Sequence, residues 1–166
     1  MTTNDDFADV LTANEHYAGS YRLGNLEARA AKGLAVLTCM DSRLDPLGML
    51  GLVPGDAKIL RNAGARVTDD VLRTLTLASY LLGVERVMLV AHTRCRMATS
   101  KGDDIHEAIL AAGGPDTTSI SFLTTNDQEA ALREDAAKVR SWAYLGNVTV
   151  GGFIYDLDTG RLRQVC

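Results

Sequence analysis

Three residues of this sequence have types and spacings that could bind a metal ion. Cys39 ends an apolar run that begins at Gly33, and His92 and Cys95 follow a second apolar run. Two thiolates and one imidazole are ligands that zinc prefers, and three protein ligands leave a fourth tetrahedral position for water. The sequence contains no second close pair of Cys or His residues that could close the site. It therefore predicts a catalytic rather than a structural zinc site.

An acid and a base follow the first cysteine. Asp41 and Arg43 lie two residues apart and could orient a water molecule on the metal. Alone, the His-x-x-Cys spacing is a weak signal, because a hydrogen-bonded histidine and a buried thiol would give the same pattern. Alone, Asp41 and Arg43 could equally be a surface ion pair that caps the next helix. Together, the two motifs favour the metal site.

The elements that must position these residues alternate between strands and helices, which is typical of an α/β fold. We expect a mostly parallel central sheet, with four parallel strands and an antiparallel edge strand, flanked by helices in a single domain of residues 1–166. The predicted strands are Gly33–Cys39, Ala57–Leu60, Val87–Ala91, Val148–Tyr155 and, at the edge, Arg161–Val165. The predicted helices are Asp5–Tyr17, one from an N-cap at Thr68 to Gly83, Ile105–Ala112 and Gln128–Trp142. Because parallel strands end at one edge of a sheet, Cys39 and His92 are expected to meet there.

Composition and charge are those of an ordinary globular protein and argue against several partners. Apolar residues make up 46% of the chain, and the formal net charge of -4 comes without a basic stripe, so neither nucleic acid nor a membrane surface is expected as a partner. Residues 1–6 lack the features of a secretory signal, and no apolar run approaches the roughly 20 residues that span a bilayer. We therefore expect a cytoplasmic protein with reduced cysteines.

Two other kinds of catalytic site have little support. The sequence has neither a Gly-x-x-x-x-Gly-Lys nor a Gly-x-Gly-x-x-Gly motif, so nucleotide binding is not indicated. No cysteine is followed by five residues and then an arginine, which is the loop of cysteine-dependent phosphatases. Another cysteine nucleophile would need a general base beside its thiolate.

Three motifs together resemble those of the β-class carbonic anhydrases. They are Cys-x-Asp-Ser-Arg at residues 39–43, Arg-Asn-Ala-Gly at residues 61–64 and His-x-x-Cys at residues 92–95. In motif terms the resemblance covers residues 33–97, and the strand that contains residues 151–156 is similar to the closing strand of that family. The chain resembles the short members, which lack long terminal extensions.

The resemblance implies a zinc-dependent carbonate dehydratase. Cys39, His92 and Cys95 would hold one Zn²⁺ per subunit, and Asp41 with Arg43 would form the catalytic dyad. Metal-bound hydroxide would hydrate carbon dioxide reversibly to bicarbonate, with activity rising above neutral pH because two thiolates weaken the Lewis acid. In some members the aspartate occupies the metal in an inactive low-pH form. The family also implies a homodimer or a dimer of dimers.

Two other functions stay open. Relatives of this fold hydrolyse carbonyl sulfide or carbon disulfide with the same ligands, and a homologue that binds zinc without catalysis also fits. The family usually has a small or acidic residue at the position of Arg94 and very often glycine at that of Arg96. We expect both arginines to face solvent or to pair with acids. The alternative is that they alter access, anion affinity or substrate choice.

Four residues outside the motifs carry further expectations. Cys166 is predicted to be a frayed terminal thiol. Phe7, Tyr17 and Tyr21 are either core residues or part of an apolar pocket across a dimer interface, since the family often takes pocket residues from a partner subunit.

Overall fold

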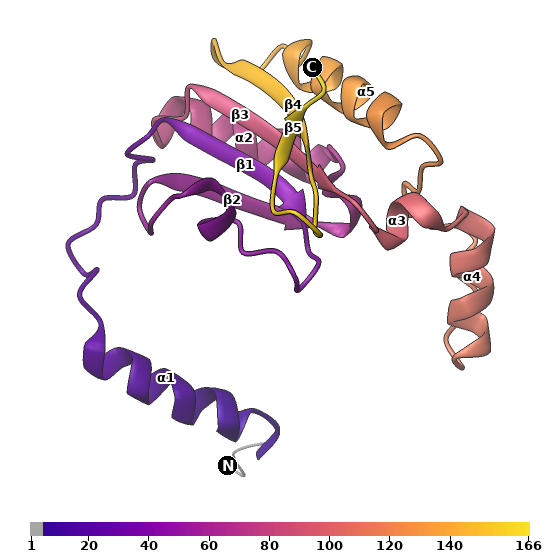
Figure 1. Ribbon diagram of the computed structural model, residues 1–166, viewed down its shortest axis with the longest axis horizontal. Helices are drawn as coiled ribbons and strands as arrows, with labels where there is room; N and C mark the ends of the chain where they lie inside the picture. Colours follow the sequence, from indigo (N-terminus) through magenta and orange to yellow (C-terminus); the bar gives the residue numbers. More distant parts are fainter. Residues whose placement is uncertain (1–4) are drawn as a thin grey trace.

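One five-stranded sheet forms the centre of the molecule in the computed structural model, which describes residues 5–166 (Figure 1). The strands are β1 (Leu34–Cys39), β2 (Ala57–Asn62), β3 (Arg86–His92), β4 (Thr149–Tyr155) and β5 (Leu162–Gln164). Their order is β2-β1-β3-β4-β5, with every neighbouring pair parallel except the antiparallel pair β4 and β5. The predicted fold class is therefore confirmed, including the antiparallel edge strand.

The helices differ in length from their predictions by a few residues at the ends. They are α1 (Ala8–Ser20), α2 (Asp69–Leu81), α3 (Arg96–Thr99), α4 (Gly102–Ala111) and α5 (Gln128–Arg140), with short 3-10 helices η1 (Asp5–Phe7), η2 (Gly48–Leu50) and η3 (Ala63–Ala65). The hydroxyl of Thr68 accepts a hydrogen bond from the Val71 amide, which confirms the predicted N-cap of α2. The side chain of Asp127 caps α5 in the same way through the amide of Ala130.

Both faces of the sheet are covered, which explains why β1 is apolar along its whole length. All six residues of β1 are buried. Helices α2 and α5 pack on one face, where Leu37 and Leu89 contact their apolar side chains. Val36 and Val90 point to the opposite face and pack against residues around η2. This rigid centre fixes the strand ends that carry the candidate ligands.

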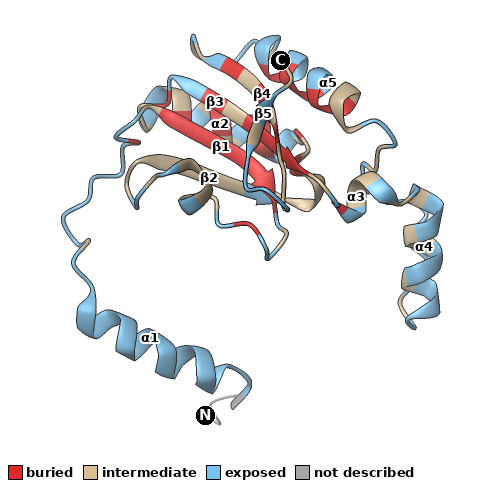
Figure 2. Ribbon diagram, in the orientation of Figure 1, coloured by how far each residue is buried: buried red, intermediate tan, exposed pale blue. Residues whose placement is uncertain are grey.

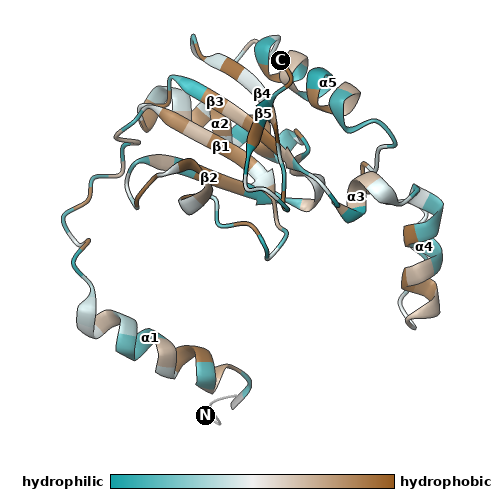
Figure 3. Ribbon diagram, viewed as in Figure 1, coloured by the Kyte–Doolittle hydropathy of each residue, from teal (hydrophilic) through white to brown (hydrophobic). Residues whose placement is uncertain are grey.

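Helix α1 stands apart from the sheet (Figures 1 and 2). None of its residues is buried, although Figure 3 shows that part of it is apolar. Phe7 is 63% exposed, and Tyr17 and Tyr21 are also exposed, so the core-packing alternative for these residues is wrong. Across residues 5–166, no helix has the length and apolar character needed to cross a membrane.

The C-terminal cysteine is ordered, contrary to the prediction of a frayed thiol. The backbone N–H of Gly152 donates to the Cys166 carbonyl over 2.9 Å, and the Cys166 N–H donates back to the Gly152 carbonyl. The side chain of Cys166 is partly buried and packs against the core. The hydrogen bonds to β4 thus extend beyond the last residue of β5, which the sequence pattern did not reveal.

Candidate metal centre

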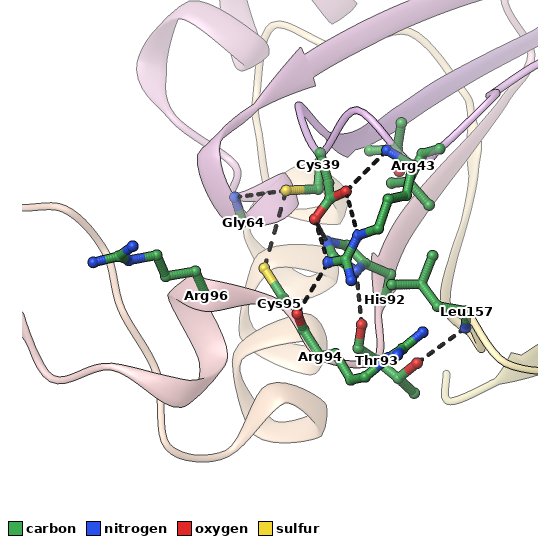
Figure 4. Close-up of polar contacts among 12 residues, drawn as sticks. Cys39, Arg43, Gly64, His92, Thr93, Arg94, Cys95, Arg96 and Leu157 are labelled. Atoms are coloured by element: carbon green, nitrogen blue, oxygen red, sulfur yellow. Dashed lines mark hydrogen bonds and ion pairs between the residues drawn. The ribbon is translucent and has the colours of Figure 1, made fainter.

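The three predicted ligands meet at the carboxyl edge of the sheet (Figure 4). Cys39 is the last residue of β1, His92 is the last residue of the neighbouring β3, and Cys95 directly precedes α3. One ligand atom from each residue lies within 4.8 Å of the other two, and the two sulfurs are 4.0 Å apart. All three residues are buried. This spacing matches the edge of a tetrahedron around an ion with metal–sulfur bonds of about 2.3 Å.

The imidazole of His92 has one nitrogen that the described residues leave without a hydrogen bond. Its Nδ1 lies 2.8 Å from the carbonyl of Thr93, which can only accept, so Nδ1 carries the proton. The buried Nε2 has no hydrogen-bond partner among the described residues. Burial also lowers the pKa of His92, which favours the neutral ring. A buried lone pair of this kind is unfavourable unless it binds a ligand, and it therefore fits a metal ion.

The two cysteines also fit a cation between them. Burial raises the pKa of the Cys95 thiol, and the neighbouring Cys39 adds to this effect. Two adjacent buried thiolates repel each other and are poorly solvated, whereas a divalent ion would compensate both charges. The donor set is therefore suited to a metal ion, and it would change from thiols to thiolates on binding.

Asp41 and Arg43 form a bidentate pair beside this cluster. Arg43 Nε donates to Asp41 Oδ1 over 2.9 Å and Arg43 Nη2 donates to Oδ2 over 2.6 Å, while the Arg43 amide donates to Oδ1. These hydrogen bonds with Arg43 hold the pKa of Asp41 far below its usual range, and the carboxylate raises the pKa of Arg43. Asp41 Oδ2 lies 3.8 Å from His92 Nε2, which places an ionised carboxylate next to the ligand atoms.

Arg61 fixes the loop that carries both Cys39 and Asp41. Its guanidinium donates to the carbonyl of Cys39 over 3.0 Å and to that of Asp41 over 2.6 Å, with a longer contact to the Leu44 carbonyl. One side chain from β2 thus holds three carbonyls of the loop after β1. Arg61 belongs to the second sequence motif, but its role becomes visible only from these contacts.

Two residues that the sequence analysis missed hold the segment around His92. The side chain of Gln128 at the start of α5 donates to the His92 carbonyl over 3.0 Å. The amide of Thr93 donates to the Tyr155 carbonyl, and its hydroxyl accepts from the amide of Leu157 over 3.0 Å. No sequence signal pointed to Gln128. Thr93 lies inside the His-x-x-Cys motif, in which its position is open to any residue type.

The two unusual arginines behave as expected. Arg94 pairs with Asp158 over 2.9 Å, and both side chains are largely exposed. Arg94 also has a φ of 55°, and its carbonyl accepts a hydrogen bond from Arg43 Nη2. Arg96 is exposed, and Figure 4 shows its side chain directed away from the cysteines. The prediction that they face solvent or pair with an acid is confirmed.

The chain is an α/β protein with a mostly parallel sheet, and the three residues clustered at the carboxyl edge of that sheet could hold a metal ion. Residues 34–162, which are more than half of the chain, match the carbonic anhydrase family. The chain belongs to the β-carbonic anhydrases.

Similar proteins agree with this assignment over the whole length. Beta-carbonic anhydrase 1 of Mycobacterium tuberculosis is 36% identical over 99% of each chain. The crystal structure of a carbonic anhydrase from Streptococcus mutans is also 36% identical, with a TM-score of 0.90 and 100% of both chains covered. A protein named carbon disulfide hydrolase from Acidithiobacillus thiooxidans is 33% identical, and the match covers 78% of this chain and 75% of the relative.

Proposed function

We propose that this chain is a zinc-dependent carbonate dehydratase that converts carbon dioxide and water reversibly into bicarbonate. The observation that carries the proposal is the cluster of Cys39, His92 and Cys95, with the unpaired Nε2 of His92 beside an ionised Asp41. The similarity to carbonic anhydrases over nearly the full length supports the same reaction.

The ligands favour zinc among the divalent ions. Two thiolates and a neutral imidazole suit its preference for sulfur and nitrogen, and they leave one tetrahedral position for another molecule. Cys39, His92 and Cys95 would hold the ion. When bound there, zinc would act as a Lewis acid that activates water at near-neutral pH.

Asp41 orients the attacking water in this proposal. Because Arg43 keeps Asp41 ionised, the carboxylate accepts a hydrogen bond and does not donate a proton. Oδ2 lies 3.8 Å from His92 Nε2, so we expect this oxygen to receive the hydrogen bond. Arg43 binds both carboxylate oxygens and the Arg94 carbonyl, which opposes rotation of Asp41 onto the metal position.

Hydrolysis of carbon disulfide or carbonyl sulfide is the second candidate. One observation favours it: the relative from Acidithiobacillus thiooxidans carries the name carbon disulfide hydrolase at 33% identity. All three substrates are small linear molecules, so the ligand set does not distinguish them. A zinc-binding homologue without catalysis is disfavoured, because the bidentate Asp41–Arg43 pair is intact.

A homodimer, or a dimer of dimers, is the assembly that the surface supports. Within residues 5–166, strand β2 lies at the end of the sheet order and pairs only with β1, so one row of its backbone groups faces away from the sheet. Helix α1 has no buried residues, and its Val10 and Leu11 are exposed together with Phe7 directly before it. A second copy could cover both features, since an exposed apolar patch usually marks an interaction surface.

The decisive experiment compares substrates on one preparation. Metal content is measured first, and carbon dioxide hydration by stopped flow is then compared with hydrolysis of carbon disulfide and carbonyl sulfide. We expect about one zinc per chain and a preference for carbon dioxide. Cys166→Ser is a suitable control, because it removes a thiol outside the ligand cluster. Metal-free protein, or metal-loaded protein that hydrolyses only the sulfur compounds, would overturn the proposal.

A further inference from the structure

The turn after β2 aims a backbone N–H group at one candidate ligand. The amide of Gly64 donates to Cys39 Sγ over 3.4 Å (Figure 4). Gly64 is the middle residue of η3, and the sulfur is one of the three clustered ligand atoms. A hydrogen bond to a metal-bound thiolate fixes the direction of the sulfur and withdraws electron density from it.

One residue of this turn has a backbone conformation that it does not adopt readily. Gly64 has a φ of 79°, and the next residue, Ala65, has a φ of 59° although it carries a β-carbon. The left-handed region is disfavoured for such a residue. A β-carbon added to Gly64 would lie 3.0 Å from Met97 Cβ, so the turn is also tightly packed. Contacts from outside η3 must therefore hold this conformation.

The carboxamide of Asn62 supplies the closest of these contacts. Its Nδ2 donates to the Arg66 carbonyl over 2.7 Å, and its Oδ1 accepts from the Arg66 amide over 2.9 Å. These two bonds connect the start of the turn to its end. The backbone of Asn62 is fixed as well, because Asn62 is the register partner of Cys39 and its carbonyl accepts from the Met40 amide.

Arg66, at the far end of the turn, is anchored to another part of the molecule. Its Nε lies 2.6 Å from Asp135 Oδ2 of α5, and Nη1 donates to the Leu123 carbonyl over 2.9 Å. Asp135 is only 5% exposed, so this ion pair is shielded from water. Both ends of the turn are thus fixed, and the Asn62 carboxamide is the side chain that joins them across Gly64.

We propose that Asn62 is a positioning residue that holds the Gly64 N–H on Cys39 Sγ and thereby reduces the electron donation of this sulfur to the metal. The inference rests on the proposed metal site. Its physical consequence is a stronger Lewis acid than two thiolates without such hydrogen bonds would provide. Asn62 acts only through the turn, because its carboxamide bonds to Arg66 and not to the ligand atoms.

Cobalt-substituted protein gives a direct test, because the thiolate-to-cobalt charge-transfer band reports the electron density on sulfur. In Asn62→Ala we expect this band to move to lower energy, because the sulfur of Cys39 regains electron density when the hydrogen bond from Gly64 is lost. Asn62→Asp keeps the acceptor and loses the donor, so a smaller shift of the same sign is expected. Asn147→Ala and Asn147→Asp are matched controls at an exposed asparagine, and neither should move the band. A folded, cobalt-loaded Asn62→Ala protein with an unchanged band would refute the inference.

A second measurement uses the unaltered protein and so does not depend on a variant that folds. In the ¹¹³Cd-loaded chain, the amide proton of Gly64 should show a scalar coupling to cadmium through the hydrogen bond to Cys39 Sγ. A resolved Gly64 amide without this coupling contradicts the inference. Failure of the metal site itself looks different, because the unaltered chain would then show no thiolate charge-transfer band at all.

Discussion

The carboxyl edge of the sheet and helix α1 differ in how far their residues are buried. At the edge, Cys39, His92 and Cys95 are buried and converge from separate elements, with hydrogen bonds that fix the backbone around them. Helix α1 buries none of its residues, and its Leu11 and the preceding Phe7 are each more than 60% exposed. The chain thus completes a ligand cluster by itself but leaves an apolar helix uncovered. This difference predicts that catalysis and assembly can be disturbed separately.

The largest effect is expected from loss of a ligand at the sheet edge. Cys95→Ser replaces a thiolate with a poor zinc ligand, so bound zinc and carbon dioxide hydration should both fall by more than about 100-fold, which is the upper range for loss of an outer-shell partner. Metal analysis and stopped-flow assays measure the two quantities. Cys166→Ser should retain both, and a Cys95→Ser protein with full zinc content would show that Cys95 is not a ligand.

A smaller effect is expected when the ligands stay and the carboxylate changes. Asp41→Asn keeps the shape of the side chain but removes its charge and weakens the bidentate pair with Arg43. We expect zinc content to stay near one per chain while kcat falls about 100-fold, the size of loss that a misplaced reacting group can cause. If zinc is lost together with activity, Asp41 helps to retain the metal and does not only orient water. Asp41→Asn and Cys95→Ser would then have the same effect.

A third prediction tests whether helix α1 contributes to self-association. Leu11→Asp places a charge on the apolar side of α1, and we expect it to weaken self-association by roughly 2–4 kcal/mol per buried site, with zinc content unchanged. Analytical ultracentrifugation gives the mass as a function of concentration. Ala13→Asp introduces the same charge on the opposite side of the helix and should leave the mass distribution intact. An unaltered chain that sediments as a monomer would contradict the proposed dimer.

The smallest effect concerns a turn next to the site and depends on pH. Hydrogen bonds from the amides of Thr159 and Asp158 lower the pKa of Asp156, so its ionised form stabilises the fold. This contribution is complete above the ordinary pKa of 3.8 and is lost as pH falls through the lower folded value. Asp156→Asn should therefore have a lower melting temperature than the unaltered chain at pH 7, and the difference should close below pH 4.

A second turn provides a check on that prediction far from the ligands. The pKa of Asp116 is lowered mainly by the amide of Thr118, so Asp116→Asn should show a melting difference of the same sign. In contrast to Asp156, this substitution lies between α4 and α5. If the difference in melting temperature between either variant and the unaltered chain grows toward low pH, the ionised carboxylate does not stabilise the fold and the prediction is wrong.

The sequence predicted the sheet and the chemically active residues because each leaves a local signal. The apolar runs revealed the strands, and Cys39 and His92 stood at the ends of two of them. Gln128 and the Gly64 amide left no such signal, since their roles depend on the distance to a carbonyl or a sulfur that only the folded chain defines. The prediction of a frayed Cys166 was wrong because backbone hydrogen bonds to β4 continue beyond the last residue of β5.

Helix α1 shows another limit of sequence patterns. The apolar side chains of this segment correctly predicted a helix. The pattern does not tell whether these side chains pack against the core of the same chain or against another molecule. The core-packing alternative for Phe7, Tyr17 and Tyr21 failed for this reason. Helix ends were also uncertain by a few residues, as at α5, which ends at Arg140 and not at Trp142.

All three candidate donors come from a single polypeptide, and this has a consequence for how the protein matures. A newly synthesised chain does not have to find a second copy before its donors converge, so uptake of the ion can precede association. During synthesis the donors emerge in the order Cys39, His92 and Cys95, and the last two are nearly adjacent. Helix α5 is synthesised later still, and its Gln128 donates the hydrogen bond that holds the His92 carbonyl. We therefore expect the ion to be bound stably only after the C-terminal part of the chain has been made.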